Sequence, residues 1–324
     1  RRQRQMCIRD RGYPAPGVVP VHDGACGTGA TPGTVFLYSG QGSQWAGMGR
    51  RLLTEEPAFA AAVDELEPDF VAQAGFSLRQ TLESGETVVG IDRIQPVLVG
   101  VQLALTALWR SHGVTPDAVI GHSMGEVTAA VVAGALSPAD GLKVISTRSR
   151  LMKRLSGQGA MALLELDAAA AEELIAGYDG LTVAVYASPN QTVIAGPPDQ
   201  VDAAIAVVDA QDKLARRVDV DVASHHPIID PILDELRTEL ATLAPRTPTI
   251  PVLVTTDGRP TDGTNVFDAD HWVANLRNPV RFARAVATAG ADHSLFVEVS
   301  PHPLLGYAIK DTLATQHHHS LGTL

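Results

Sequence analysis

The sequence predicts an α/β fold in which a smaller unit of the ferredoxin-like type is inserted into a larger α/β unit. Three observations predict it. Short β-type runs alternate with helical segments over residues 34–157 and again over 222–313. Between them, residues 158–221 give the order strand, helix, strand, strand, helix, strand. A Gly-x-Ser-x-Gly turn follows an apolar strand of the larger unit and opens a helix.

The first part of the larger unit alternates apolar runs with helical periodicity. The helix behind the serine turn, VTAAVVAGAL, is small and apolar all round, which is typical of a helix buried against a sheet. The predicted elements, in order, are a strand at 35–38, helices at 50–72 and 94–112, a strand at 118–121 and a helix ending near Leu136.

The inserted unit and the return to the larger unit follow from period-2 apolar runs and proline or aspartate at helix starts. In the inserted unit we expect strands at 160–166, 181–187, 191–196 and 215–222, with helices at 167–178 and 197–211. After it we expect a helix at 228–243, a strand at 250–256, a helix at 279–289 and a strand at 295–300.

Composition excludes several classes of function. The net charge of −11 argues against a nucleic-acid binder, and no uninterrupted apolar run approaches the roughly 20 residues of a membrane span. Two cysteines are too few for a disulfide framework, and the adjacent histidines at 317–319 have no further ligands nearby, so we expect no metal site. A cytoplasmic protein is expected. Residues 1–33 are expected to be a tail and linker, residues 314–324 a C-terminal tail, and the whole an excised domain.

Ser123 is the candidate nucleophile. It lies in AVIGHSMGEV, where the glycines have the Gly-x-Ser-x-Gly spacing. That spacing alone also fits an ordinary glycine-flanked turn. Its position between an apolar strand and a small-residue helix is the context of a nucleophile elbow. The N-terminus of the helix would supply N–H donors where negative charge develops.

His225 is the candidate base, because a serine hydroxyl is a weak nucleophile until a base takes its proton. It follows the strand at 215–222 almost directly, where the chain leaves the inserted unit. A cleft between two units is a favoured place for an active site. Asp219 and Asp221 could orient this histidine, but aspartates that alternate along a strand also mark a solvated face.

The loop GQGSQWAGMG is rich in glycine but does not bind a nucleotide by its pattern. Trp45 stands where Gly-x-Gly-x-x-Gly needs its third glycine, and no Gly-Lys-Ser/Thr follows. Glycine removes steric bulk, so backbone N–H groups of this loop can approach an oxyanion closely.

Arg148 is the most informative single residue. The segment SPADGLKVISTRSRLMKRL opens with an N-cap serine and a proline at the first helical position. At ~100° per residue, Arg148 falls inside the apolar arc of this helix. A buried guanidinium needs an anionic partner. That partner is either an internal carboxylate in a structural ion pair or a substrate carboxylate, which arginine binds through two N–H groups.

Seven segments, in order, resemble motifs of the acyltransferase domains of modular type I polyketide synthases, which are similar to malonyl-CoA:acyl-carrier-protein transacylases. They are FLYSGQGSQWAGMG, IQPVLVGVQLAL, GHSMGEVTAAVVAGAL, SPADGLKVISTRSRLM, VASHHP, NPVRF and VEVSPHPLL. The resemblance implies an α/β-hydrolase-like core, residues 34–157 and 222–313, carrying a ferredoxin-like subdomain, residues 158–221.

The resemblance also implies roles for individual residues. Ser123 would be acylated, His225 would be its base, and Arg148 would bind the free carboxylate of an extender unit. Backbone carbonyls rather than Asp219 or Asp221 would orient the histidine. The remaining site residues would be Gln41 and Met124, whose N–H groups form an oxyanion hole, together with Gln95 and His122, which line the site.

The implied reaction moves an acyl group from acyl-CoA to Ser123 and then to the phosphopantetheine thiol of an acyl carrier protein, in polyketide or branched-lipid synthesis. Neighbouring synthase domains would be further partners, and the domain itself would bind no cofactor. The residues before the histidine, Val222, Ala223 and Ser224, resemble the YASH-like sequences that accompany methylmalonyl rather than the HAFH of malonyl. Ser224 in place of phenylalanine would leave room for an α-methyl group, so methylmalonyl is favoured over malonyl.

Three alternatives remain open from the sequence. A serine esterase or thioesterase would use the same serine but has no need of Arg148. A carrier-protein docking module without catalysis would not need Ser123 and His225 intact. A starter-unit loading domain commonly lacks the arginine, whose presence therefore favours an extender role.

Overall fold

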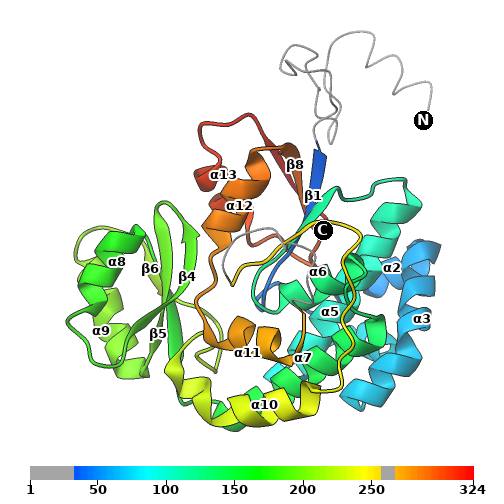
Figure 1. The fold of residues 1–324 in the computed structure, drawn as a ribbon, viewed down its shortest axis with the longest axis horizontal. Helices are drawn as coiled ribbons and strands as arrows, with labels where there is room; N and C mark the ends of the chain where they lie inside the picture. Colours follow the sequence, from blue (N-terminus) through cyan, green and yellow to red (C-terminus); the bar gives the residue numbers. More distant parts are fainter. Residues whose placement is uncertain (1–32, 257–266) are drawn as a thin grey trace. The chain divides into compact units, whose positions relative to one another are not determined.

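The structure, a computed structural model, describes residues 33–256 and 267–324. The predicted tail and linker at 1–33 lies outside the described residues except for Gly33, which begins β1. Gly33–Leu324 forms one compact unit. Its architecture is a mixed α/β fold with a parallel sheet and a separate antiparallel sheet (Figure 1).

The parallel sheet has the strand order β7-β2-β1-β8-β9. The whole of β2 and the last four residues of β1 are apolar and buried, as expected when helices cover both sides of the sheet. Val35 of β1 lies opposite Ala118 of β2 and Phe296 of β8. The five strands are β1 (Gly33–Tyr38), β2 (Ala118–Gly121), β7 (Val252–Leu253), β8 (His293–Glu298) and β9 (His319–Gly322).

Helices surround this sheet, and many begin with a short polar side chain that caps the first turn. Ser77, Ser137 and Asp268 each accept a hydrogen bond from the backbone N–H three residues on. The helices are α2 (Arg50–Glu55), α3 (Pro57–Ala74), α4 (Leu78–Ser84), α5 (Ile91–Ser111), α6 (Gly125–Val132), α7 (Pro138–Met152), η1 (Lys153–Leu155), η2 (Pro227–Ile232), α10 (Leu233–Leu240), α11 (Ala269–Arg277), α12 (Phe282–Gly290) and α13 (Gly306–Thr312).

The antiparallel sheet has the order β4-β5-β3-β6 and carries α8 and α9 (left in Figure 1). Along the chain its elements run β, α, β, β, α, β, which confirms the predicted order. Its last strand is much shorter than the predicted 215–222. The elements are β3 (Ala160–Leu164), α8 (Ala168–Ile175), β4 (Thr182–Ser188), β5 (Gln191–Gly196), α9 (Pro198–Asp209) and β6 (Ala215–Arg217).

Backbone hydrogen bonds join the two sheets' units at Val280, just before α12. Tyr186 N–H of β4 donates to Val280 O, and Val280 N–H donates to Ala184 O, both at 2.9 Å. The segment between α11 and α12 therefore extends the edge of the antiparallel sheet. This pairing fixes the antiparallel sheet against the elements that hold the candidate base.

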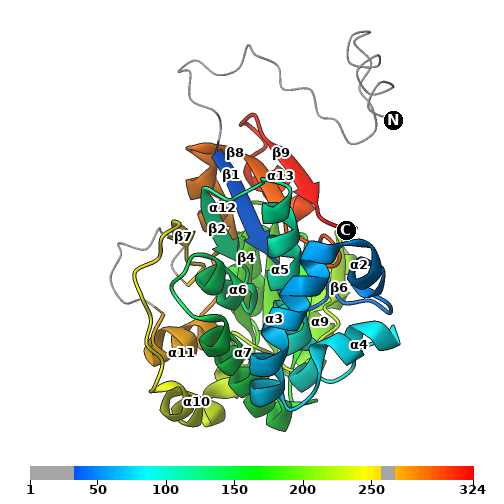
Figure 2. The ribbon, with the colours of Figure 1, turned by 90° about the vertical axis from the view of Figure 1, so that its right-hand side faces the viewer.

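Three further sequence predictions need correction. The C-terminal tail predicted at 314–324 is wrong in part, because His319–Gly322 form β9 and pair in parallel with β8 (Figure 2). The helix predicted at 50–72 is interrupted before Pro57, and the one at 228–243 begins as a 3-10 helix that contains Pro231. Helices α4 and α11 were not predicted from the sequence. The more specific description of the core as α/β-hydrolase-like stays a prediction.

Helix α5, Ile91–Ser111, is long and apolar enough to cross a membrane by length and composition alone. In this fold 72% of its apolar window is buried inside the protein. It packs against α3 and α7. A buried core helix accounts for this composition without a membrane.

Candidate active site

Ser123 occupies a strained turn between β2 and α6. Its φ of 54° lies in the left-handed region that residues other than glycine seldom adopt. The flanking glycines are required by close backbone approach. A Cβ on Gly121 would lie 2.1 Å from Glu126 Cα, and one on Gly125 would lie 2.1 Å from Tyr38 O. The Gly-x-Ser-x-Gly pattern is therefore the steric condition for this turn.

The Ser123 hydroxyl lies beside the imidazole of His225. The distance from Ser123 Oγ to His225 Nε2 is 2.7 Å, and His225 Nδ1 lies 2.8 Å from the backbone oxygen of Asn278. A carbonyl oxygen only accepts, so Nδ1 carries the proton and Nε2 is left to accept from the serine. The histidine is thus oriented by a backbone carbonyl. Asp221 instead accepts a hydrogen bond from Ser156.

His225, like the serine, has a strained backbone conformation. Its φ of 62° is also in the left-handed region, and its N–H donates to Leu276 O at 2.9 Å. Burial, with a smaller effect of the Arg148 charge, lowers the pKa of His225 to about 3. The imidazole is consequently neutral near pH 7, which is the form that can accept a proton.

Arg148 lies on the inner face of α7 with 2% of its surface exposed. Its Nη2 donates to Ser123 Oγ at 3.0 Å and its Nη1 to Asn275 Oδ1 at 2.8 Å. Its Nε–H has no partner among the residues that the structure describes. Burial lowers the pKa of this guanidinium to about 10, so it is charged at neutral pH. The predicted apolar arc is confirmed, since these residues are buried: Leu142, Val144, Ile145, Leu151, Met152 and Leu155.

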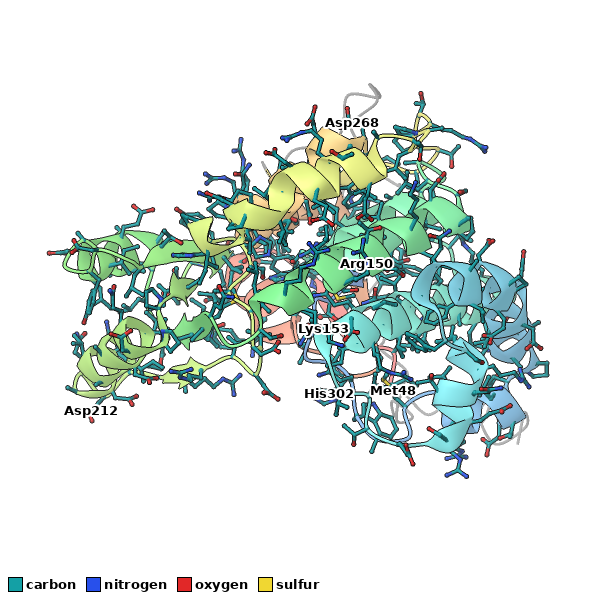
Figure 3. All side chains as sticks on the ribbon, turned by 90° about the horizontal axis from the view of Figure 1, so that it is seen from below. Met48, Arg150, Lys153, Asp212, Asp268 and His302 are labelled. Carbon is teal, nitrogen blue, oxygen red and sulfur yellow. The ribbon has the colours of Figure 1, made fainter. Side chains whose placement is uncertain are left out.

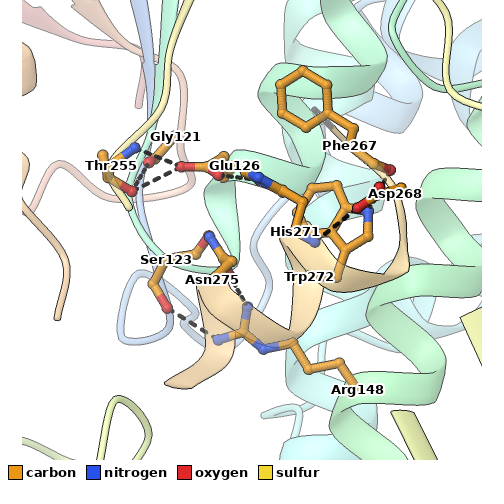
Figure 4. A network of polar contacts seen from close by, with 10 residues as sticks. All are labelled: Gly121, Ser123, Glu126, Arg148, Thr255, Phe267, Asp268, His271, Trp272 and Asn275. Atoms are coloured by element: carbon orange, nitrogen blue, oxygen red, sulfur yellow. Dashed lines mark hydrogen bonds and ion pairs between the residues drawn. The ribbon is translucent and has the colours of Figure 1, made fainter. Parts of the chain in front are cut away.

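A second polar network lies on the other side of the serine turn, around Glu126 in the first turn of α6 (Figure 4). One carboxylate oxygen accepts from Thr255 N–H at 2.7 Å and from its hydroxyl at 2.8 Å. The other lies 2.7 Å from His271 Nε2. Glu126 is fully buried, and its carboxylate oxygens are both engaged. This network ties α6 to α11 and to the end of β7.

A cleft of about 450 Å³ opens onto Ser123 between the two sheets. Gln41, Gln95 and Met124 line it, with Gln95 Nε2 3.4 Å from Gln41 Oε1. The N–H groups of Gln41 and Met124 donate to no acceptor within residues 33–256 and 267–324. Two backbone donors of cleft-lining residues are therefore unpaired.

His122 also lines the cleft, with its ring 5.3 Å from that of Phe282 in an edge-to-face contact. Its Nδ1 has no hydrogen-bond partner in the described part of the chain. Burial, opposed by the charge of Glu126, lowers the pKa of His122 to about 4. It is therefore an uncharged wall of the cleft.

Only two of the three candidate specificity residues line the cleft. Val222 and Ser224 line the cleft, and the Ser224 hydroxyl lies 3.8 Å from Met161 Sδ. Ala223 is fully buried in a core cluster instead. A Cβ on Gly159 would lie 2.5 Å from the Ala223 Cβ, so the Ala223 side chain packs directly against the backbone of Gly159.

A family model described as "Acyl transferase domain" matches residues 35–324. The chain belongs to this family. One subunit of the phenolphthiocerol/phthiocerol polyketide synthase of Mycobacterium tuberculosis (strain CDC 1551 / Oshkosh) is 67% identical over 312 residues, which are 96% of this chain and 17% of that protein. The chain thus spans about a sixth of the length of this curated relative.

Two solved structures extend the comparison. The acyltransferase domain of the polyketide synthase PpsC of Mycobacterium tuberculosis has 59% identity and a TM-score of 0.87, covering 90% of this chain and 91% of that one. The acyltransferase domain from module 8 of the salinomycin polyketide synthase has 37% identity and a TM-score of 0.88, covering 98% and 75%. The acyl transferase domain formed by this chain is therefore a transferase of the polyketide synthase type, and the predicted family is confirmed.

The acyl transferase domain brings together every site residue predicted from the sequence except Ala223 in one cleft. It also adds residues that the sequence did not reveal. Asn275 bonds Arg148, and its Nδ2 donates to Ser123 O at 3.3 Å. Glu126 and His271 are two further such residues, and the contact between them links α6 to α11, the helix that carries Asn275. Trp272 and Leu276 could have marked the buried face of α11 on which Asn275 lies, but that helix was not predicted, and local periodicity could not have placed Asn275 beside Arg148.

Proposed function

We propose that this domain transfers a carboxylated extender unit, methylmalonyl in preference to malonyl, from CoA to the phosphopantetheine thiol of an acyl carrier protein. The observation that carries the proposal is the shared oxygen. Ser123 Oγ lies within hydrogen-bond distance of a neutral imidazole on one side and a buried guanidinium on the other. A carboxylate bound to Arg148 would therefore hold the rest of its acyl group beside the nucleophile.

In the first half-reaction, Ser123 Oγ attacks the thioester carbonyl of acyl-CoA while its proton moves to His225 Nε2. The carbonyl oxygen becomes an oxyanion, which the N–H groups of Gln41 and Met124 would stabilise. The tetrahedral intermediate then breaks its C–S bond. The proton on His225 goes to the sulfur, and CoA leaves as a thiol.

In the second half-reaction, the phosphopantetheine thiol of the carrier protein gives its proton to His225 and attacks the acyl-serine. The C–O bond breaks, and Ser123 recovers its proton from the imidazolium. Arg148 holds the carboxylate throughout, so the ester carbonyl keeps one orientation toward the incoming thiol. The mechanism uses no resident cofactor, since CoA is a substrate and phosphopantetheine belongs to the partner.

Methylmalonyl is favoured because of the wall of the cleft near the histidine. Ser224 is small and lines the cleft next to Met161, so an α-methyl group has space that a phenylalanine would fill. One methyl group is worth only ~1–3 kcal/mol of discrimination. Malonyl-CoA is the second candidate substrate of the same mechanism.

The parent protein is proposed to be a cytoplasmic multidomain polyketide synthase. This rests on the relative of 67% identity, of which the domain spans 17%, and which is named for phenolphthiocerol and phthiocerol. Neighbouring synthase domains and a carrier protein are its expected partners. We propose that the product is a polyketide-type lipid.

The proposal is tested by intact mass after brief incubation of the domain with equal methylmalonyl-CoA and malonyl-CoA, beside Ser123→Ala. We expect a methylmalonyl adduct that is absent from the Ser123→Ala variant. A carrier protein with its phosphopantetheine arm should then remove the adduct and gain its mass. A malonyl adduct would replace the proposed extender, and adduct loss to water that ignores the carrier would refute transfer.

A further inference from the structure

Arg148 is a buried cation whose hydrogen-bond partners are all neutral. Its two terminal nitrogens donate to an amide oxygen of Asn275 and to the hydroxyl oxygen of Ser123, and its Nε–H is unpaired in the described part of the chain. A guanidinium that is 2% exposed is expected to find a carboxylate, because an unpaired buried charge is costly. Here the position that a carboxylate would take is filled by Asn275.

The buried acid whose charge acts on Arg148, Glu126, does not take that position. Glu126 acts on the Arg148 charge through space and favours its charged form, opposing the effect of burial. Yet both of its oxygens are engaged, one by Thr255 and the other by His271. Figure 4 shows Asn275 between the guanidinium and the backbone of the serine turn, with Glu126 on the far side. The charge of Arg148 is thus held in place without being neutralised by direct contact.

We propose that Asn275 is a specificity-determining residue, whose neutral amide positions Arg148 while reserving its charge for the carboxylate of the extender unit. This inference rests on the proposed function. An aspartate has nearly the same size and would place a charged oxygen 2.8 Å from Arg148 Nη1, where the amide oxygen now lies. The domain would then contain its own counter-ion.

The consequence differs between acyl groups with and without a carboxylate. A substrate carboxylate would have to share the guanidinium with an internal carboxylate that is already in place, and the two anions repel each other. An acyl group without a carboxylate meets no such repulsion. The charge at position 275 therefore acts on selectivity, whereas a loss of packing or of a hydrogen bond would slow both kinds of substrate alike.

The experiment compares Asn275→Asp with Asn275→Ala and the native domain. Methylmalonyl-CoA and propionyl-CoA form a matched pair that differs by one carboxylate, as do malonyl-CoA and acetyl-CoA. The measured quantity is kcat/KM for acyl-serine formation with each member, expressed as the carboxylated-to-neutral ratio. Gln73→Glu, at an exposed position on α3, adds the same charge away from the cleft. Thermal melting verifies that each variant is folded.

We expect Asn275→Asp to lower the ratio at least tenfold, mainly through slower reaction with the carboxylated acyl-CoA. Asn275→Ala loses the bonds to Arg148 and to Ser123 O but adds no charge, so both rates should fall and the ratio should stay within about threefold. Gln73→Glu should change neither rate. A ratio unchanged in a folded Asn275→Asp domain, or equally lowered in Asn275→Ala, would overturn the inference.

The outcome is separable from failure of the proposed function. A native domain that acylates Ser123 with propionyl-CoA as readily as with methylmalonyl-CoA would refute the proposed substrate class itself. A native domain with a strong preference for carboxylated substrates that Asn275→Asp leaves intact would refute only the role of Asn275. Should Asn275→Asp fail to fold, Asn275→Glu places the same charge on a longer side chain, and the same ratio is measured for it.

Discussion

Helix α7 carries two arginines, two residues apart, of which one is buried on its inner face and the other is exposed on its outer face. Arg148, on the inner face, is 2% exposed and bonded only to neutral groups. Arg150, on the outer face, has a side chain that is 49% exposed and pairs with Glu239 of α10. Figure 3 labels Arg150 and Lys153 on this outer side. Lys153 pairs with Asp92, and Arg154 pairs with Glu235.

The difference shows how burial changes the free energy of an ion pair. The exposed pairs lie in water, where salt screens them and each is worth about 0–1 kcal/mol. The buried cation has little water around it, so a carboxylate that reaches it gains far more. The buried arginine without an internal acid is therefore the proposed carboxylate site, whereas the exposed arginine with its acid makes an ordinary surface ion pair.

Replacement of Arg148 by alanine breaks this comparison most strongly. We expect kcat/KM for the carboxylated acyl-CoA to fall roughly 10³-fold, because a buried charge-assisted contact is worth about 2–5 kcal/mol. The rate with propionyl-CoA should fall less than about tenfold, through loss of the hydrogen bond to Ser123 Oγ. Single-turnover acylation with both substrates measures this. Equal losses for the two would mean that Arg148 serves the nucleophile and not the carboxylate.

Replacement of Glu126 by alanine tests the closed network behind the serine. The change leaves Thr255 and His271 without their acceptor in a buried site, and we expect a loss of about 3 kcal/mol in the free energy of unfolding. Denaturant titration measures it. Glu126→Gln keeps the shape and one acceptor oxygen and should cost less. A loss below about 1 kcal/mol for alanine would show that water replaces the carboxylate.

The rate of acylation and the free energy of unfolding should depend differently on pH. The pKa of His225 is lowered to about 3, so the base stays neutral and acylation should change less than about twofold between pH 7.5 and 5.5. A histidine of ordinary pKa 6.5 would lose about tenfold over the same range. Initial rates at constant ionic strength check this. An inflection near pH 6.5 would contradict it.

Stability, unlike activity, should depend on pH in this range. In the unfolded chain His225 and His122 take up protons as the pH falls through 6.5, whereas in the folded domain they stay neutral until about 3 and about 4. The unfolded state therefore binds more protons in that window, and the free energy of unfolding should fall with falling pH, by up to ~1.4 kcal/mol per unit for each histidine. Denaturant titrations at pH 7 and 5.5 measure it.

Much of the fold was predictable because local signals agreed with the packing. The apolar strand before Ser123 and the small-residue helix after it are confirmed, and so is the apolar arc that contains Arg148. Asn275 and the carbonyl of Asn278 could not be found that way. Their roles depend on α11 lying against the serine turn, a long-range contact that no local periodicity encodes. β9 was missed because His319–Gly322 lack an apolar alternation and gain their strand from pairing with β8.

Replacement of Arg150 by alanine should have the smallest effect. The ion pair with Glu239 is half exposed, so its removal should change the free energy of unfolding by less than about 1 kcal/mol, and by less again at 1 M salt. Acylation kinetics with carboxylated and neutral acyl-CoA should match those of the native domain. Arg150→Ala and Arg148→Ala each remove one guanidinium group from α7, so the two variants form a matched pair. A large selectivity change on the outer face would mean that the summed field of the helix, and not direct contact at Arg148, recognises the carboxylate.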